Sequence, residues 1–201
     1  MARASHAHRV MTASTTTIRK TPSDFYAWLD GMMHFTIDVC ADESNHQHPR
    51  YFSEKDNGLL QSWEGETFFC NPPYGDQIGS WLRKARDSSI LDSAMGALLV
   101  PARVDTDWWR TYVMQADGAA GKLRLVHFDA QKQVIWFRWE RLTIGLYHHD
   151  QRLKFDDLAT GAPFPASVIF MAHPRRRPVK PALSSALPDN RDWVLLVEQW
   201  P

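Results

Sequence analysis

Cysteine is scarce in this 201-residue chain, and long apolar runs are absent. Only Cys40 and Cys70 are present, which argues against a disulfide framework and predicts two buried free thiols in a reducing cytosol. No apolar run approaches the ~20 residues of a membrane-spanning helix, so we do not expect an integral membrane protein. Lysine plus arginine (23) balances aspartate plus glutamate (23), which excludes a uniformly basic nucleic-acid binder but allows a local basic surface.

Several motifs of enzyme chemistry are also missing. The sequence has no glycine-rich phosphate-binding loop and no G-x-S-x-G nucleophile elbow. Three histidine pairs occur, but no cysteine pair or third ligand accompanies them at a regular spacing. We therefore predict surface histidines and no metal site. The pairs are His6/His8, His46/His48 and His148/His149.

The two ends of the chain differ in composition from its middle. Residues 1–20 hold no acidic residue and many serines and threonines, which predicts a flexible, weakly basic arm, with organelle targeting as the alternative. Residues 174–201 open on PRRRPVKP, whose prolines exclude a helix or a central strand. This basic tail is either a solvated linker or a strap that contacts phosphates, and residues 193–200 predict a short terminal strand.

The body of the chain, residues 21–173, has the pattern of a single α/β domain. Thr21 and Pro22 predict a helix start, with Thr21 as N-cap and Pro22 at the first helical position. Short unbroken apolar runs separated by amphipathic helices predict a sheet with helices on both faces, and the C-terminal half adds antiparallel strands at one edge. The predicted strands are 35–41, 67–70, 94–100, 122–128, 133–139, 142–147 and 166–171; the predicted helices are 21–32, 76–90 and 105–114.

The segment Asn71-Pro72-Pro73-Tyr74 directly follows a predicted strand. In an open α/β sheet, ligands bind beyond the carboxyl ends of the strands. Two prolines fix an extended backbone and remove two N–H donors, so the loop offers carbonyl acceptors beside an asparagine oxygen. Tyr74 adds an aromatic face. This combination suits an amino group on a flat ring, although a plain strand-to-helix turn is the alternative.

At this point the sequence resembles a known family. The NPPY segment is similar to motif IV of amino methyltransferases that use S-adenosylmethionine. The wider pattern resembles the phage and prophage (Dam-like) DNA N6-adenine methyltransferases over about residues 21–171. The elements that carry the resemblance are Thr21-Pro22, Asp38–Ala41, Asn45, Tyr51-Phe52, Asp56–Leu59 with Trp63, Asn71–Tyr74, Trp81 with Lys84-Ala85, Pro101–Arg103, Asp105-Thr106, Trp108-Trp109, Gly121–Arg124, Arg152–Phe155 and Ala162–Pro165.

The resemblance implies a Rossmann-like methyltransferase sheet in residues 21–173 and direct methyl transfer from S-adenosylmethionine to N6 of a flipped adenine. Asn71 and the carbonyl of Pro72 would accept the amine hydrogens, Pro73 would hold the loop, and Tyr74 would stack on the base. Departures are Cys40 in place of alanine, Asn57 between Asp56 and Gly58, and a longer, tryptophan-rich 125–147 region. The residues expected at the cofactor are Thr21, Pro22, Asp38, Ala41 and Asp56.

DNA is the implied partner, with no membrane and no obligate protein partner. Trp136 and Trp139 suit either base insertion or a sheet core, and periodicity favours the core for at least one. We expect a monomer in the cytoplasm of a bacterial or phage-infected cell. The alternatives are another amino acceptor (cytosine N4, an RNA base or glutamine) and a non-catalytic DNA-binding relative. The basic residues expected to contact DNA are Arg83, Lys84, Arg86, Arg103, Arg138 and Arg141.

Overall fold

A computed structural model describes residues 19–129, 133–149, 153, 155, 165–174, 194 and 195. Most of the predicted arm (1–18), most of the predicted tail, and the resemblance elements at 152, 154 and 162–164 lie outside these residues. The elements are α2 (Ser23–Met33), β1 (Ile37–Asp38), β2 (Thr67–Cys70), α3 (Ile78–Leu91), β3 (Met95–Pro101), the π-helix η1 (Trp109–Val113), β4 (Leu123–Asp129), β5 (Val134–Trp139), β6 (Thr143–His148), β7 (Ala166–Ala172) and β8 (Val194–Leu195).

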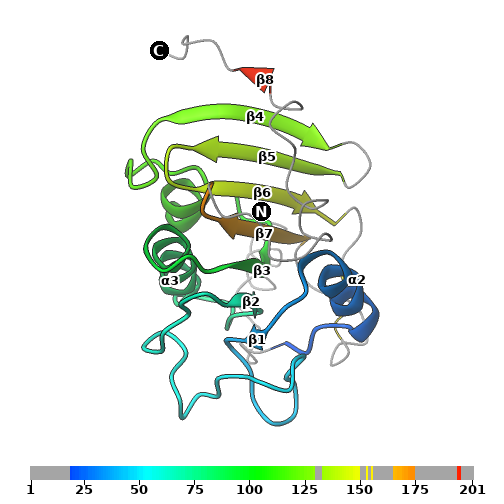
Figure 1. Cartoon of the computed structure of the whole chain (residues 1–201). Coiled ribbons are helices and arrows are strands. Elements are labelled where there is room, and N and C mark those ends of the chain that lie inside the picture. Colours follow the sequence, from blue (N-terminus) through cyan, green and yellow to red (C-terminus); the bar gives the residue numbers. More distant parts are fainter. Residues whose placement is uncertain are drawn as a thin grey trace, which may run out of the picture.

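The strands form one mixed eight-stranded sheet in the order β1-β2-β3-β7-β6-β5-β4-β8 (Figure 1). The first three strands are parallel, and β7, β6, β5, β4 and β8 extend the sheet antiparallel beyond β3. Every residue of β2, β3 and β7 is buried, as expected for central strands of mainly apolar sequence. The prediction of an α/β protein with antiparallel strands in its C-terminal half is confirmed.

Two clusters of apolar side chains form the core. One contains Trp81 and Leu82 of α3 together with side chains of β2, β3, β6 and β7. The other contains Phe25 and Leu29 of α2 with the alternate side chains of the same sheet. Cys70 is buried in the first cluster, and the half-buried Cys40 packs against it; neither forms a disulfide.

The predicted start of the first helix is wrong in one detail. The helix begins at Ser23, and Pro22 occupies the N-cap position without a side-chain cap. Thr21 lies one residue before the N-cap, and its hydroxyl accepts a hydrogen bond from the side chain of Asn71. The carbonyl of Pro22 accepts the first helical bond, from the N–H of Tyr26.

Two other predicted elements are shorter or differently wound than expected. The predicted strand 35–41 contains only the two residues of β1. On the side away from β2, Asp38 bonds to a loop: its N–H donates to the carbonyl of Arg50, and its carbonyl accepts from the N–H of Phe52. The predicted helix 105–114 includes the π-helix η1, which ends with the N–H of Met114 donating to Trp109. The other predicted strands of the body and helix α3 agree with the structure to within two residues, and of the predicted terminal strand 193–200 only Val194–Leu195 (β8) are described.

Candidate active site

The carboxyl ends of the three parallel strands gather the predicted site residues. Asp38 in β1 pairs with Phe69 in β2, so the chain after Phe69 passes beside the residues that follow Asp38. Strand β2 pairs in turn with β3, which ends at Pro101. The structure therefore brings Asp38 and Asn71 to one edge of the sheet, where ligands of α/β proteins bind.

The side chain of Asn71 is 6 % exposed, and among the described residues only the nitrogen of its amide group is hydrogen-bonded. Its Nδ2 donates to the carbonyl of Arg19 at 2.6 Å and to Oγ1 of Thr21 at 3.0 Å. Its Oδ1 is buried and has no hydrogen-bond partner within the described part of the chain. Because buried polar atoms are nearly always paired, a lone buried acceptor at a sheet edge points to a missing donor.

The rest of the Asn-Pro-Pro-Tyr loop turns the chain from β2 into α3. Pro72 is buried, whereas Pro73 and Tyr74 are half-buried. The ring of Tyr74 meets Phe155 edge to face, with centroids 6.2 Å apart. Gly75 has φ +134°, a backbone angle that side chains with a Cβ rarely adopt, so glycine permits the tight exit into the helix.

Asp38 is a buried carboxyl group, only 2 % exposed. It accepts hydrogen bonds from the backbone N–H groups of Gln47 (3.1 Å) and Cys40 (3.3 Å). Burial raises its pKa to about 7, although these two hydrogen bonds oppose the shift. The Nε2 of Gln47 donates to the carbonyl of Thr21, so one chain of hydrogen bonds links Asp38, Gln47, Thr21 and Asn71.

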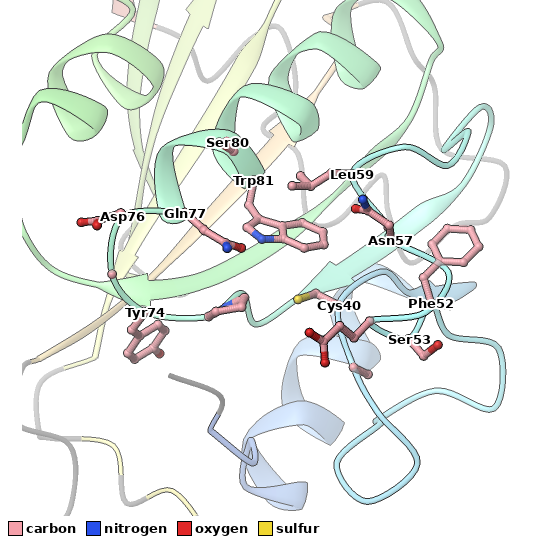
Figure 2. A pocket seen from close by; sticks show the side chains of 15 residues that line it. Cys40, Phe52, Ser53, Asn57, Leu59, Tyr74, Asp76, Gln77, Ser80 and Trp81 are labelled. Carbon is pink, nitrogen blue, oxygen red and sulfur yellow. The ribbon is translucent and has the colours of Figure 1, made fainter. Parts of the chain in front are cut away.

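A cleft of about 1060 Å³ is lined by residues that follow Asp38 and Asn71 in the sequence, among them Cys40 and Tyr74 (Figure 2). Figure 2 shows Trp81 across the cleft from Cys40, with Tyr74 and Phe52 toward opposite ends. The Nε1 of Trp81 is a buried donor without a partner within the described residues. The cleft is lined by Cys40, Ala41, Phe52, Ser53, Glu54, Asn57, Gly58, Leu59, Pro73, Tyr74, Gly75, Asp76, Gln77, Ser80 and Trp81.

The predicted cofactor residues divide into three groups by position. Ala41 lines the cleft. Thr21 and Asp38 are joined by hydrogen bonds through Gln47 and are not among the residues that line the cleft, and Pro22 is buried between Thr21 and α2. Asp56 is not brought into the cleft.

The expectation for Asp56 does not match its geometry. Its exposed carboxylate accepts from the N–H (2.8 Å) and the hydroxyl (2.6 Å) of Ser53, and these bonds lower its pKa. Asp56 therefore stabilises a local turn, a common role of aspartate. Its neighbours Glu54 and Asn57 line the cleft instead. Asn57 adopts φ +52°, a conformation that asparagine tolerates, and the sequence signal for this turn is the asparagine between Asp56 and Gly58.

Arg86 is the clearest correction among the predicted DNA contacts. It is only 6 % exposed, and its guanidinium donates to the carboxylates of Asp87 and Asp117 and lies over the ring of Tyr112. The side chain thus links α3 to the segment after η1. A buried guanidinium paired with two carboxylates is not available to a phosphate.

The remaining predicted basic residues lie nearer the surface. The side chain of Arg83 is 68 % exposed, and Lys84 lies over the ring of Trp63. Arg103 pairs with Asp105, and Arg141 donates to the carbonyl of Ala119. Arg138 is half-buried on β5.

Trp136 and Trp139 are both core residues, at 2 % and 5 % exposure. Trp136 packs against Phe170, and Trp139 against Phe137. The alternative of base insertion by these two rings is wrong. Among the described residues no cluster of three metal-ligating side chains occurs, and no helix is long and apolar enough to cross a bilayer.

The parallel strands, the Asn-Pro-Pro-Tyr loop and the cleft lined by Pro73 and Tyr74 agree with the arrangement that the resemblance to amino methyltransferases implies. Residues 11–134, more than half of the chain, match the family described as DNA N-6-adenine-methyltransferase (Dam). The chain belongs to this family.

One relative is the DNA N-6-adenine-methyltransferase of Haemophilus phage HP1 (strain HP1c1). It is 28% identical to this chain over 116 residues. The match covers 53% of this chain and 65% of the relative's length.

Proposed function

We propose that this protein is a DNA adenine-N6 methyltransferase that uses S-adenosylmethionine. Membership of the Dam family supports the reaction class. The observation that carries the proposal is the Oδ1 of Asn71, a buried acceptor without a partner within the described residues, at the end of β2. An exocyclic amine supplies the donor that this atom lacks.

The Asn-Pro-Pro-Tyr loop acts by orienting the amine. Asn71 Oδ1 and the carbonyl of Pro72 each accept one hydrogen of the N6 amino group, so the nitrogen lone pair is directed away from the loop. Tyr74 offers a half-buried aromatic face, and stacking of a base on such a ring contributes about 1–3 kcal/mol. The target adenine must leave the duplex to reach this position.

The cleft and its surroundings fit the proposed cofactor, which supplies an electrophilic methyl group when bound. The volume of about 1060 Å³ lies at the upper end of small-molecule sites. Phe52, Leu59 and Trp81 provide apolar walls for an adenosyl group, and the unpartnered N–H of Trp81 provides a donor for one of its nitrogens or oxygens. Asp38 provides a buried carboxylate for an ammonium group.

The finer features of the fold and setting follow from the same proposal. The sheet is Rossmann-like, with α2 and α3 covering its two faces through the two core clusters. DNA is the macromolecular partner, and Arg83, Lys84 and Arg103 supply exposed or half-exposed charge for its phosphates. The protein acts as a monomer in the cytoplasm of a bacterial or phage-infected cell.

The test is methyl transfer from radiolabelled S-adenosylmethionine to unmethylated DNA, followed by digestion to nucleosides. We expect the label in N6-methyladenine. Label in N4-methylcytosine would contradict the adenine acceptor while preserving the cofactor. No label in DNA, with cofactor binding demonstrated by calorimetry, would contradict DNA as substrate, and RNA and protein acceptors would then be compared under the same conditions.

A further inference from the structure

The side-chain amide of Asn71 has two orientations that differ by exchange of its oxygen and nitrogen. Only one of them presents an acceptor to an incoming amine, because the other presents the NH₂ group, which is a donor. The proposed reaction therefore needs the orientation to be fixed before the base arrives. The following inference rests on that proposed function.

The carbonyl of Arg19 sets the orientation. It accepts from Asn71 Nδ2 at 2.6 Å. A flipped amide would put Oδ1 against this carbonyl oxygen, so two acceptors would face each other without a proton between them. A hydrogen bond at this distance is made by one orientation only.

Thr21 holds the amide in place from a second direction. Its Oγ1 accepts the other Nδ2 hydrogen at 3.0 Å, and the side chain is 1 % exposed, so water does not replace it. Both donors of the Asn71 amide are thereby satisfied within the protein, and Oδ1 alone remains for a ligand.

Thr21 is itself fixed by the residues proposed to hold the methionine end of the cofactor. Its carbonyl accepts from Gln47 Nε2 at 3.1 Å, and the backbone N–H of Gln47 donates to Asp38. The backbone of Thr21 thus joins the Asp38 loop, and its hydroxyl joins Asn71. No helix-capping bond competes for this hydroxyl, because α2 has no side-chain cap.

We propose that Thr21 is a positioning residue for methyl transfer, whose hydroxyl holds the Asn71 amide with its oxygen toward the target amine. The resemblance implied only a cofactor contact for Thr21. The role proposed here acts on the acceptor side of the reaction, through Asn71.

The test compares Thr21→Val, which keeps the shape but removes the hydroxyl, with Thr21→Ser, which keeps the hydroxyl. Loss of a partner for a buried amide donor predicts a decrease of about tenfold in the single-turnover rate for Thr21→Val. Calorimetric affinity for S-adenosylhomocysteine changes less than about threefold, and Thr21→Ser restores the rate. In an Asn71→Ala background, Thr21→Val causes no further decrease, because the two residues act as one unit.

A second readout does not depend on catalysis. In the cofactor-free protein, the two Nδ2 protons of Asn71, observed by ¹⁵N NMR, are protected from solvent exchange in the wild type and in Thr21→Ser, and the proton bonded to Thr21 loses its protection in Thr21→Val. An unchanged rate and unchanged protection in Thr21→Val would overturn the proposal, as would an equal decrease in the Asn71→Ala background or a loss confined to cofactor affinity. A wild type that methylates no adenine would refute the proposed function instead, and the NMR comparison would still decide whether Thr21 holds the amide.

Discussion

At the scale of single residues, the burial of Asp38 makes the stability of the protein depend on pH. Its burial at 2 % exposure raises its pKa from 3.8 to about 7. The neighbouring Tyr26 and Cys70 stay protonated across the neutral range, since burial raises the pKa of each. Without a ligand, the protein must bury a negative charge when Asp38 ionises. The stability cost is absent below pH 4, grows as pH rises to about 7, and is complete above it.

An ammonium group beside Asp38 reverses this preference, because it stabilises the ionised form. We therefore predict that the affinity for S-adenosylhomocysteine, which carries the amino group of the methionine moiety, increases about tenfold between pH 5.5 and 7.5. Isothermal titration calorimetry across this range measures the effect. Asp38→Asn is the matched control, whose weaker binding does not change with pH. A flat profile for the wild type would contradict the assignment of Asp38 to the amino group.

At the scale of secondary structure, α3 connects the catalytic loop with the cleft. It begins three residues after Gly75 and carries Trp81 to the cleft wall. The ring of Trp81 also stacks near Trp63, with centroids 6.3 Å apart, so one face of α3 serves both the core and the cleft. The two indoles differ in their N–H groups: that of Trp63 donates to Gly58 at 2.9 Å, whereas that of Trp81 has no partner within the described residues.

This difference predicts that replacing tryptophan by phenylalanine lowers ligand affinity at Trp81 and thermal stability at Trp63. Trp81→Phe removes the indole N–H that we expect to donate to the ligand, so the affinity for S-adenosylhomocysteine falls about tenfold. The Tm changes only by the effect of the smaller ring. Trp63→Phe breaks an internal hydrogen bond, so the Tm falls while affinity is nearly unchanged. Calorimetry and thermal unfolding of both variants provide the comparison. Equal affinities for Trp81→Phe and the wild type would show that the indole N–H does not contact the cofactor.

At the scale of the whole molecule, the apolar runs determine most of the fold. Strands β2 and β3 are buried on both faces and are mainly apolar, so their positions can be predicted from the sequence. The position of the Asn-Pro-Pro-Tyr loop could also be predicted, because the loop directly follows a strand. The length of β1 was not, because its partners on one side are loop residues, as in the bridge between Asp38 and Tyr51.

Long-range contacts account for the other misses. The residues adjacent to Arg86 in the sequence do not predict its ion pair with Asp117. Those adjacent to Thr21 do not predict its hydrogen bond with Asn71. Likewise, the aromatic-rich region around Trp136 reads equally well as a DNA-binding face or a core until β5 is known to pack against β6 and β4. Contacts with residues far away in the sequence determine the roles of these residues, and the local sequence pattern does not reveal such contacts.

The central claim is that Asn71 Oδ1 accepts a hydrogen bond from the amino group that is methylated. The most direct measurement is the single-turnover rate of N6-methyladenine formation by the wild type and by Asn71→Ala, with both proteins saturated with S-adenosylmethionine and DNA. The account predicts a decrease of about 10²- to 10³-fold, similar to the loss of one preorganised hydrogen bond at other reacting groups, with unchanged cofactor affinity. Equal rates for the two folded proteins would contradict it.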